Sequence, residues 1–342
     1  MKHFTARWMS AILTPEAHVA EVKKGMFVDL LDGSFHIMGR TWPTSLLLGA
    51  ILFFPTSWFF GWAYGRFFDV LANVARGSAE DPLGTLALFG KAYFWIILAA
   101  LAQGLVLLFV RACVTAHAAL AVRGKEATPF TIIPEVARTK FLRLLGQRVL
   151  QTAILGITLA AGMTLAGAAV GVAIALKAMA LAIVLGTILG IGSAAVYLWA
   201  TVRFSLTLES LVINDAKIEE SLDQSALLIR GDWWRVLGCI LLFGLMVSFA
   251  SSIIATPVLF FSSIRQYGEF LRSLLQEKSG NADLNVSLMK LLAGMGRKLG
   301  LMAYLQSLLA GFVSPVFMTL LFFALKKRRK SSKRPAAGES SS

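Results

Sequence analysis

The chain has 342 residues, of which 57% are hydrophobic and 15% are charged, and its formal net charge is +14. Soluble domains are about 45–50% apolar and about 25% charged, so this composition predicts an integral membrane protein with several spans. Most basic residues flank apolar segments and are not interleaved with stacking aromatics, which favours membrane topology and anionic headgroups over nucleic acid as the reason for the charge.

The apolar patch before Pro15 is too short for a signal peptide, so we predict no cleaved signal. Six apolar segments follow this N-terminal stretch. Each segment is long enough to cross about 30 Å of hydrocarbon as a helix. Because long apolar runs satisfy their backbone in lipid only as helices, we expect an all-α, polytopic fold. Pro55 and Pro257 interrupt two of them, where we expect kinks. The segments are 44–64, 93–117, 149–176, 178–203, 236–261 and 299–325.

The third and fourth segments are nearly continuous, which predicts either a tight turn with Lys177 at its tip or a re-entrant helix. Both segments contain a GxxxG pattern, which places two glycines on one helix face and allows close approach of a neighbouring backbone. We expect the two segments to pack as a hairpin; a homodimer face or flexible gating helices are the alternatives. The glycines are Gly167, Gly171, Gly186 and Gly190.

The distribution of lysine and arginine predicts the orientation. With six spans both ends lie on one side, together with residues 123–148 and 203–235, and this side carries most of the basic residues, which places it in the cytoplasm. The basic loop 263–298 falls on the other side and is long enough to form an interfacial helix. Residues 326–342 are predicted to be a disordered tail that sets orientation or contacts anionic lipid or ribosome.

The chain also matches itself at a constant offset. Arg203 aligns with Arg111, Thr207 with Thr115 and Glu209 with His117, and a fainter third copy surrounds Trp42. The repeats, roughly 27–122, 131–210 and 216–325, each comprise an amphipathic helix followed by two spans. We expect these helices to lie in the headgroup plane. Interfacial anchors are then predicted at Trp42, Trp233, Trp234 and Arg235.

The repeat offers two readings of Arg111, His117, Arg203 and Glu209. As structural anchors, the arginines end even-numbered spans and extend to lipid phosphate. As a binding site, the four residues converge on an inner-leaflet cavity that holds a phosphate headgroup. We predict membrane lipid, with anionic phospholipid favoured, as the partner of the protein, and no nucleic acid.

Motifs of the common enzyme classes are missing from the sequence. We find no GxxxxGK[ST], HExxH, CxxC or GxSxG, and the four histidines and two cysteines show no metal-ligand spacing. No carboxylate lies near the middle of a predicted span. We therefore predict no enzyme activity, no cofactor and no metal.

The stretch TVRFSLTLESLVINDAKIEESLDQSALLIRGDWWRVLG, which contains Glu209, Ser225, Arg230 and Trp233, resembles the signature of a large family. That family comprises bacterial six-helix membrane proteins related to the membrane domain attached to some glycerophosphodiester phosphodiesterases. The segment from Gly33 to Trp42 is similar to the beginning of these proteins. The resemblance implies a six-helix fold; without a phosphodiesterase domain it implies no phosphodiesterase activity.

We accordingly predict a non-enzymatic protein of the bacterial inner (cytoplasmic) membrane, with both termini in the cytoplasm. It would bind or organise inner-leaflet lipid, or support envelope homeostasis. A small-molecule exporter or channel subunit is the first alternative, favoured by the repeat, the prolines and the glycine-rich hairpin. An assembly partner of an envelope complex is the second alternative, and no residue points to its protein partner.

Overall fold

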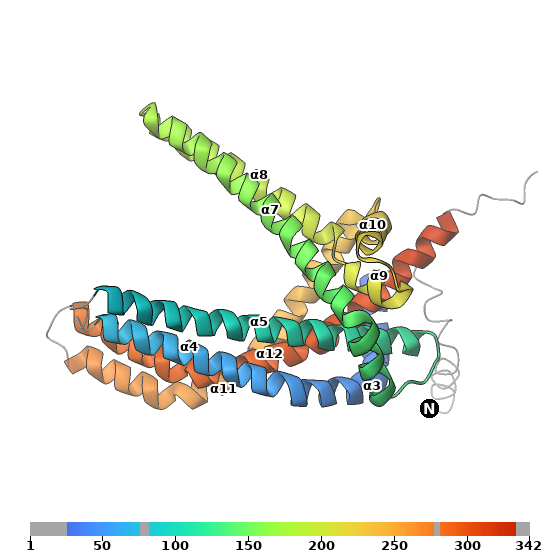
Figure 1. The fold of residues 1–342 in the computed structure, drawn as a ribbon, viewed down its shortest axis with the longest axis horizontal. Coiled ribbons are helices and arrows are strands. Elements are labelled where there is room, and N and C mark those ends of the chain that lie inside the picture. Colours follow the sequence, from blue (N-terminus) through green and yellow to red (C-terminus); the bar gives the residue numbers. More distant parts are fainter. Residues whose placement is uncertain (1–25, 76–81, 277–280, 333–342) are drawn as a thin grey trace, which may run out of the picture. The chain divides into compact units, whose positions relative to one another are not determined.

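The computed structural model describes residues 26–75, 82–276 and 281–332, and every regular element in these ranges is a helix. The expectation that the chain has no cleaved signal concerns residues 1–25 and lies outside the described residues. In chain order the elements are α3 (Met26–Leu48), the π-helical turn η1 (Gly49–Phe53), α4 (Phe54–Ala75), α5 (Pro82–Val122), α6 (Pro129–Glu135), the π-helical turn η2 (Val136–Lys140), α7 (Phe141–Ala175), α8 (Met179–Arg203), α9 (Thr207–Asn214), α10 (Ile218–Ile229), α11 (Trp233–Gln276) and α12 (Asn281–Ser332) (Figure 1).

Among the described residues, 6 helical segments are long and apolar enough to cross a membrane. Each of them overlaps one of the six predicted apolar runs, so the prediction of an all-helical, multi-pass membrane protein is confirmed. Many large apolar side chains on these helices are exposed, as expected for surfaces that face lipid. The segments are Phe27–Asn73, Leu86–Val122, Pro129–Ala175, Met179–Asn214, Trp233–Ile254 and Gly300–Arg329.

The helices form two compact units. Among the described residues, unit 1 contains 26–35, Thr115–Leu242 and 317–332, and unit 2 contains 36–75, 82–114, 243–276 and 281–316. The boundaries fall within α3, α5, α11 and α12, so each unit holds a part of each of these helices. The sequence predicts one domain over residues 1–325, and no linker-like composition marks this division.

In unit 2, α12 packs against both α4 and α5. Gly300 of α12 lies so close to α4 that a Cβ there would come within 2.7 Å of the Ser57 carbonyl oxygen and 3.1 Å of Gly61 Cα. On the α5 side, Gln103 Nε2 donates a hydrogen bond to Ser307 Oγ at 2.9 Å. Small residues and interhelical hydrogen bonds are the usual means of joining helices in lipid, where apolar burial drives association weakly.

The helix is distorted next to Pro55 but keeps its α-helical type at Pro257. The π-helical turn η1 ends just before Pro55, and it contains Ile51, whose carbonyl would clash with the proline ring in a regular α-helix. The distortion expected at Pro55 is therefore taken up by this turn. Helix α11 continues through Pro257 without a change of helix type.

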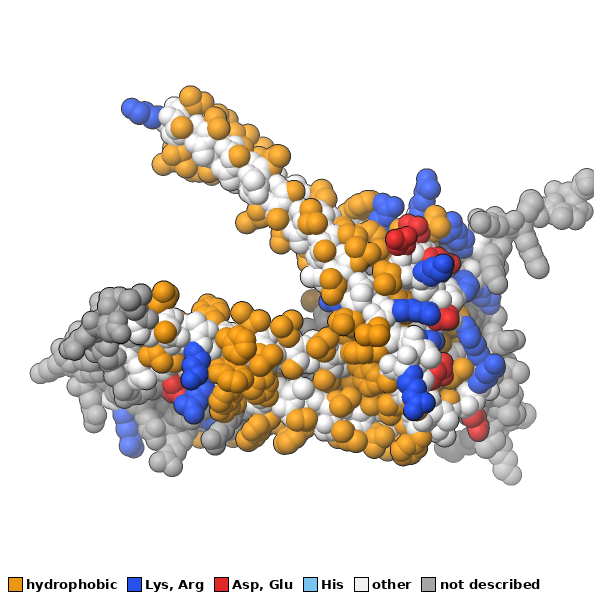
Figure 2. All heavy atoms as spheres, in the orientation of Figure 1, with side chains coloured by type: hydrophobic (Ala, Val, Ile, Leu, Met, Phe, Trp, Pro, Cys, Tyr) orange, Lys and Arg blue, Asp and Glu red, His pale blue; other side chains and the backbone are white. Residues whose placement is uncertain are grey.

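In unit 1, α7 and α8 form the predicted hairpin and lie side by side (Figure 1). The turn is tight: Lys177 N donates to Ile174 O at 2.8 Å, and Ala178 N donates to Ala173 O at 2.9 Å. Lys177 has φ 57, so a lysine occupies the left-handed position that normally favours glycine at this type of helix end. The side chains along the hairpin are mainly hydrophobic and exposed (Figure 2).

Two boundary predictions are wrong. Residues 263–298 do not form a separate interfacial helix, because residues 263–276 continue α11 and residues 281–298 begin α12. The predicted disordered tail begins too early, because α12 runs to Ser332 and contains the basic residues from Lys326 onward. Lys326 and Arg328 interact with other residues of unit 1, as described below, and these interactions keep the last part of α12 in place.

The predicted repeat units differ in secondary structure. In the last unit, α10 is a separate helix, and Gly231 with φ 94 divides it from α11. The corresponding segment of the middle unit runs from α6 through η2 into α7 without a break. One face of α10 is buried, as a one-sided helix requires, but the three-fold repeat and the position of these helices in the headgroup plane stay predictions.

Candidate functional site

The connection between α8 and α9 is fixed by a serine of α10. Ser225 Oγ donates to the carbonyl oxygen of Arg203 at 2.9 Å and accepts from the amide of Leu206 at 3.1 Å. Both groups lie where the chain leaves one helix and enters the next, so their hydrogen-bonding capacity has no partner within a helix. Ser225 therefore holds the start of α9 against α10.

Two glutamines of α7 hold the same connection from the other side. Gln147 Nε2 donates to Thr207 Oγ1 at 2.8 Å and to Gln151 Oε1 at 3.1 Å. Gln151 Nε2 in turn donates to the Phe204 carbonyl oxygen at 3.2 Å. Both glutamines are buried, so these bonds are made in a poorly hydrated interior where an unmade bond is costly. The position of α9 is thereby set relative to α7.

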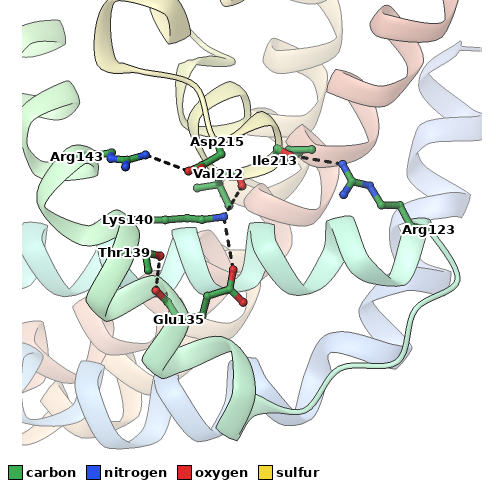
Figure 3. Close-up of polar contacts among 8 residues, drawn as sticks. All are labelled: Arg123, Glu135, Thr139, Lys140, Arg143, Val212, Ile213 and Asp215. Carbon is green, nitrogen blue, oxygen red and sulfur yellow. Dashed lines mark hydrogen bonds and ion pairs between the residues drawn. The ribbon is translucent and has the colours of Figure 1, made fainter.

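The carboxyl-terminal end of α9 is surrounded by basic side chains, which we call the α9 basic cluster: Arg123, Lys140, Arg143 and Lys326. Lys140 Nζ donates to Val212 O at 2.9 Å, and Arg123 donates to Ile213 O at 3.5 Å (Figure 3). These cations satisfy carbonyl groups that the end of a helix leaves without a partner, and they favour the negative end of its dipole.

The other two members of the cluster bind side chains at the same helix end. Arg143 pairs with the Asp215 carboxylate at 3.1 Å, and Lys326 Nζ donates to Asn214 Oδ1 at 2.8 Å. Asp215 has φ 52, a left-handed conformation that aspartate tolerates and that ends α9. The four cations come from the loop after α5, from η2, from α7 and from α12, so the fold gathers them from distant parts of the sequence.

The cluster has both structural and accessible members. Lys140 lies 3.8 Å from Glu135 and its side chain is only 14% exposed, so its charge is largely engaged within the protein. The side chain of Arg143 is 49% exposed, and Arg123 is also exposed. Charged side chains of both signs gather over α9 and α10 (Figure 2), and the two arginines keep donor groups available to an external anion.

A second ion group lies beside the start of α11. Asp232 pairs with Arg328 at 2.8 Å and with Arg235 at 3.1 Å. Arg235 is one of the predicted interfacial anchors, and its guanidinium is exposed. The pair with Arg328 ties the end of α12 to the beginning of α11, where the sequence predicts a disordered tail.

The predicted anchors Arg203, Trp233 and Trp234 lie near one another, around Trp199 of α8. The Arg203 guanidinium is 4.9 Å from the ring centre of Trp199, and Trp233 Nε1 donates to the Trp199 carbonyl at 3.4 Å. Trp234 packs edge-on against Trp233 at 4.7 Å and is 78% exposed. Tryptophan and arginine gathered at the ends of apolar helices are typical of a membrane–water interface.

The other members of the predicted phosphate site lie in different surroundings. Glu209 and His117 are 4% and 6% exposed, so they are internal residues of unit 1. Arg111 belongs to unit 2, where it donates to Ser314 Oγ at 3.3 Å. Convergence of these residues with Arg203 on one cavity stays a hypothesis.

The remaining predicted residues are Trp42 and the four glycines. Trp42 is exposed on α3. A Cβ at Gly186 would meet Val170 at 3.0 Å, but one at Gly167, Gly171 or Gly190 would meet nothing within 4 Å. The closest approach within the hairpin is instead at Gly162, which faces Ser193. Sequence spacing could not single out Gly162, because glycine is frequent throughout both segments.

Contacts within unit 2 define how α5 and α12 are aligned along their length. The bonds Gln103–Ser307 and Arg111–Ser314 join residues 204 and 203 apart, so α5 and α12 run in the same direction in nearly constant register. That register brings Lys298 level with Phe94 and Trp95.

An aromatic belt marks the Trp95 level. Trp95 packs edge-on against Phe59 at 6.1 Å and Trp62 at 5.7 Å, and Arg66 lies 5.8 Å from the Trp62 ring centre. Aromatic rings accompanied by a cation are characteristic of the headgroup depth. The belt therefore indicates a membrane boundary of unit 2 near Trp95.

A cavity of about 190 Å³ lies just inside the belt, between α4 and α12. Phe54 and Tyr304 form part of its wall and pack edge-on at 5.9 Å. Burial lowers the pKa of Lys298, whose side chain also lines the cavity. The full lining is Phe54, Ser57, Trp58, Lys298, Gly300, Leu301 and Tyr304.

Comparison of the chain with protein-family models, curated proteins and solved structures finds no match. Function must therefore be inferred from the sites. Among the described residues, no group of three or more His, Cys, Asp or Glu side chains could hold a metal ion. The α9 basic cluster is the site that sequence reasoning missed; its only sequence signal is the position of its cations at the ends of apolar runs.

Proposed function

We propose that the chain is a non-enzymatic membrane protein that binds the headgroups of anionic phospholipids through the α9 basic cluster. The observation that carries this proposal is the gathering of four cations around one helix end, two of them with exposed guanidinium groups. Basic pockets between membrane helices bind anionic headgroups by the same chemistry. Arginine suits the role because its planar donors match two phosphate oxygens.

The position of the cluster supports lipid as the source of the anion. Apolar sequence ends at Val122 in α5 and at Leu325 in α12, just before Arg123 and Lys326. In α7 the long apolar run begins after Arg148. This position at the polar ends of three apolar helices supports contact of the cluster with lipid phosphate.

We extend the proposal to orientation and ancestry. The positive-inside rule supports a cytoplasmic location for the α9 basic cluster, in the inner leaflet of a bacterial inner membrane. The three-fold repeat with interfacial amphipathic helices belongs to the same proposal, supported by the aligned residues Arg111 and Arg203 and by the one-sided burial of α10. The resemblance to the six-helix family related to the glycerophosphodiester phosphodiesterase membrane domain likewise rests on sequence motifs.

The test is native mass spectrometry of the full chain, extracted in mild detergent and titrated with phosphatidylglycerol or phosphatidylcholine. The double variant Arg123→Gln/Arg143→Gln removes the two exposed guanidinium groups. Each interfacial cation contributes about 1 kcal/mol of attraction to anionic lipid, so we expect phosphatidylglycerol binding to weaken about 30-fold. Binding of phosphatidylcholine should change much less.

Arg138→Gln is the matched control, since Arg138 is an exposed arginine of η2 outside the cluster. This variant also removes one positive charge, but outside the cluster. Its affinity for phosphatidylglycerol should therefore fall only by the nonspecific effect of that charge. If the double variant retains its helical circular dichroism and binds phosphatidylglycerol like the unchanged protein, headgroup binding by this cluster is refuted. The exporter and assembly-partner hypotheses would then take precedence.

A further inference from the structure

The cavity between α4 and α12 has the properties of a slot for a hydrocarbon chain. Its accessible lining is apolar, and its volume of about 190 Å³ is below the roughly 300–1,000 Å³ of pockets for drug-sized ligands. Phe54 and Trp58 stack at 6.2 Å along one wall, and both are more than half exposed. The slot is thus small and is bordered by exposed aromatic side chains of α4.

Helices α4 and α12 pass very close to each other beside the slot. A Cβ at Gly300 would come within 2.7 Å of the Ser57 carbonyl oxygen, so glycine is required for α12 to pass this closely. The Ser57 hydroxyl is buried and has no hydrogen-bond partner among the described residues. Gly300 and Ser57, which meet at this close crossing, line the cavity together with the aromatic rings of Phe54, Trp58 and Tyr304.

Lys298 adds a charge at the rim. It lies level with Trp95 and the aromatic belt, at headgroup depth, while Tyr304 lies more than one helical turn deeper. Lysine side chains at this depth in membrane proteins commonly bury their methylenes along apolar surface and keep the ammonium near the headgroups. Apolar depth below and a cation above match the two ends of an anionic lipid.

We propose that this cavity binds one acyl chain of an anionic glycerophospholipid, with the lipid phosphate held at the Lys298 ammonium. The site belongs to unit 2 and shares no residue with the α9 basic cluster. It is therefore independent of the proposed headgroup function, and either can fail without the other.

The experiment uses the full chain in lipid nanodiscs with phosphatidylglycerol that carries a diazirine on its acyl chain. After photolysis, crosslinked peptides are identified by mass spectrometry. We expect adducts on Trp58 and Tyr304, and about fivefold fewer in Lys298→Gln, the effect of losing one interfacial charge. Lys298→Arg should retain them, and Lys177→Gln, which alters the tip of the hairpin, should leave them unchanged.

Two further arms separate the parts of the proposal. Diacylglycerol with the same diazirine chain lacks phosphate, so its adducts should not depend on Lys298. Leu301→Trp fills the slot and should abolish the adducts of both probes at Trp58 and Tyr304. Arg123→Gln/Arg143→Gln, the variant that tests the headgroup proposal, should leave these adducts unchanged.

Bulk lipid contact gives a different pattern and would overturn the proposal. In that case adducts would be spread over the exposed residues of α4 and α12, and neither Lys298→Gln nor Leu301→Trp would change them. Loss of adducts in Leu301→Trp alone, with no effect of Lys298→Gln on phosphatidylglycerol, would refute the phosphate contact at Lys298.

Discussion

At the scale of single residues, some buried hydroxyl groups in unit 1 make hydrogen bonds to described residues and others make none. Thr207 Oγ1 accepts from Gln147 and donates to the Phe204 carbonyl at 2.9 Å. Thr319 is fully buried, and its hydroxyl has no hydrogen-bond partner among the described residues. Replacement by valine keeps the shape of the side chain and removes only the hydroxyl, so the two positions form a matched pair.

We expect Thr207→Val to lower the free energy of unfolding by about 1–3 kcal/mol, because it leaves a buried amide of Gln147 with one acceptor fewer. Thr319→Val should be neutral or stabilising, since it removes a buried polar group that makes no bond. Denaturant titration of both variants in the same detergent measures the difference. An equal loss of stability at both positions would contradict the hydrogen-bond network assigned to Thr207.

Residue-scale contacts also explain which predicted site residues are accessible. The sequence alone predicts an interfacial position for Arg203, Trp233, Trp234 and Arg235, because they are polar or amphipathic and lie at the ends of apolar helices. Glu209 and His117 occupy comparable sequence positions but are buried, because neighbouring helices cover them. Burial of this kind depends on contacts between distant segments, and the sequence pattern contains no signal of it.

At the scale of elements, the tightest glycine contact of the α7–α8 hairpin is the one between Gly162 and Ser193. A Cβ at Gly162 would lie 2.7 Å from Ser193 Cβ, which is far closer than side-chain carbons normally approach. A Cβ at Gly171 would meet nothing within 4 Å. Alanine at the two positions therefore has opposite consequences.

Gly162→Ala should separate the helices and lower the thermal unfolding midpoint, because Ser193 is itself bonded to Leu189 O at 2.7 Å and cannot move freely. Gly171→Ala should maintain or raise the midpoint, as helix propensity improves by up to about 1 kcal/mol. The double variant Gly162→Ala/Ser193→Gly should recover most of the loss. Failure of that rescue would show that Gly162 acts through something other than this contact.

At the scale of the whole molecule, the hairpin fixes a topological relation that labelling can test. Residues 125 and 217 flank the hairpin, and Lys177 is at its tip, so a membrane-crossing hairpin places the tip on the opposite side from the flanks. The native cysteines Cys113 and Cys239 are buried, which keeps background labelling low.

Lys125→Cys and Lys217→Cys should react with an impermeant maleimide from the same side of sealed membrane vesicles, and Lys177→Cys only from the other side. The positive-inside rule predicts that the shared side is the cytoplasm. Labelling of all three positions from one side would mean that the segments are re-entrant and do not cross. Permeabilised vesicles provide the control for reactivity.

The sequence by itself determined the helical class and the number of candidate spans, because lipid leaves a long apolar run no other satisfied backbone conformation. It also determined the hairpin turn at Lys177, since two apolar runs there are separated by almost no polar sequence. These properties depend on residues close together in the chain, so periodicity and length suffice to reveal them.

Only the tertiary structure decided which residues meet. The α9 basic cluster joins Arg123, Lys140, Arg143 and Lys326 through hydrogen bonds to one helix end, and no spacing rule connects them. The cavity of unit 2 is likewise lined by residues of α4 and α12, which pass close to each other at Gly300. Both sites depend on side-chain packing between distant segments, whereas a single sequence specifies the periodicity and polarity of each segment separately.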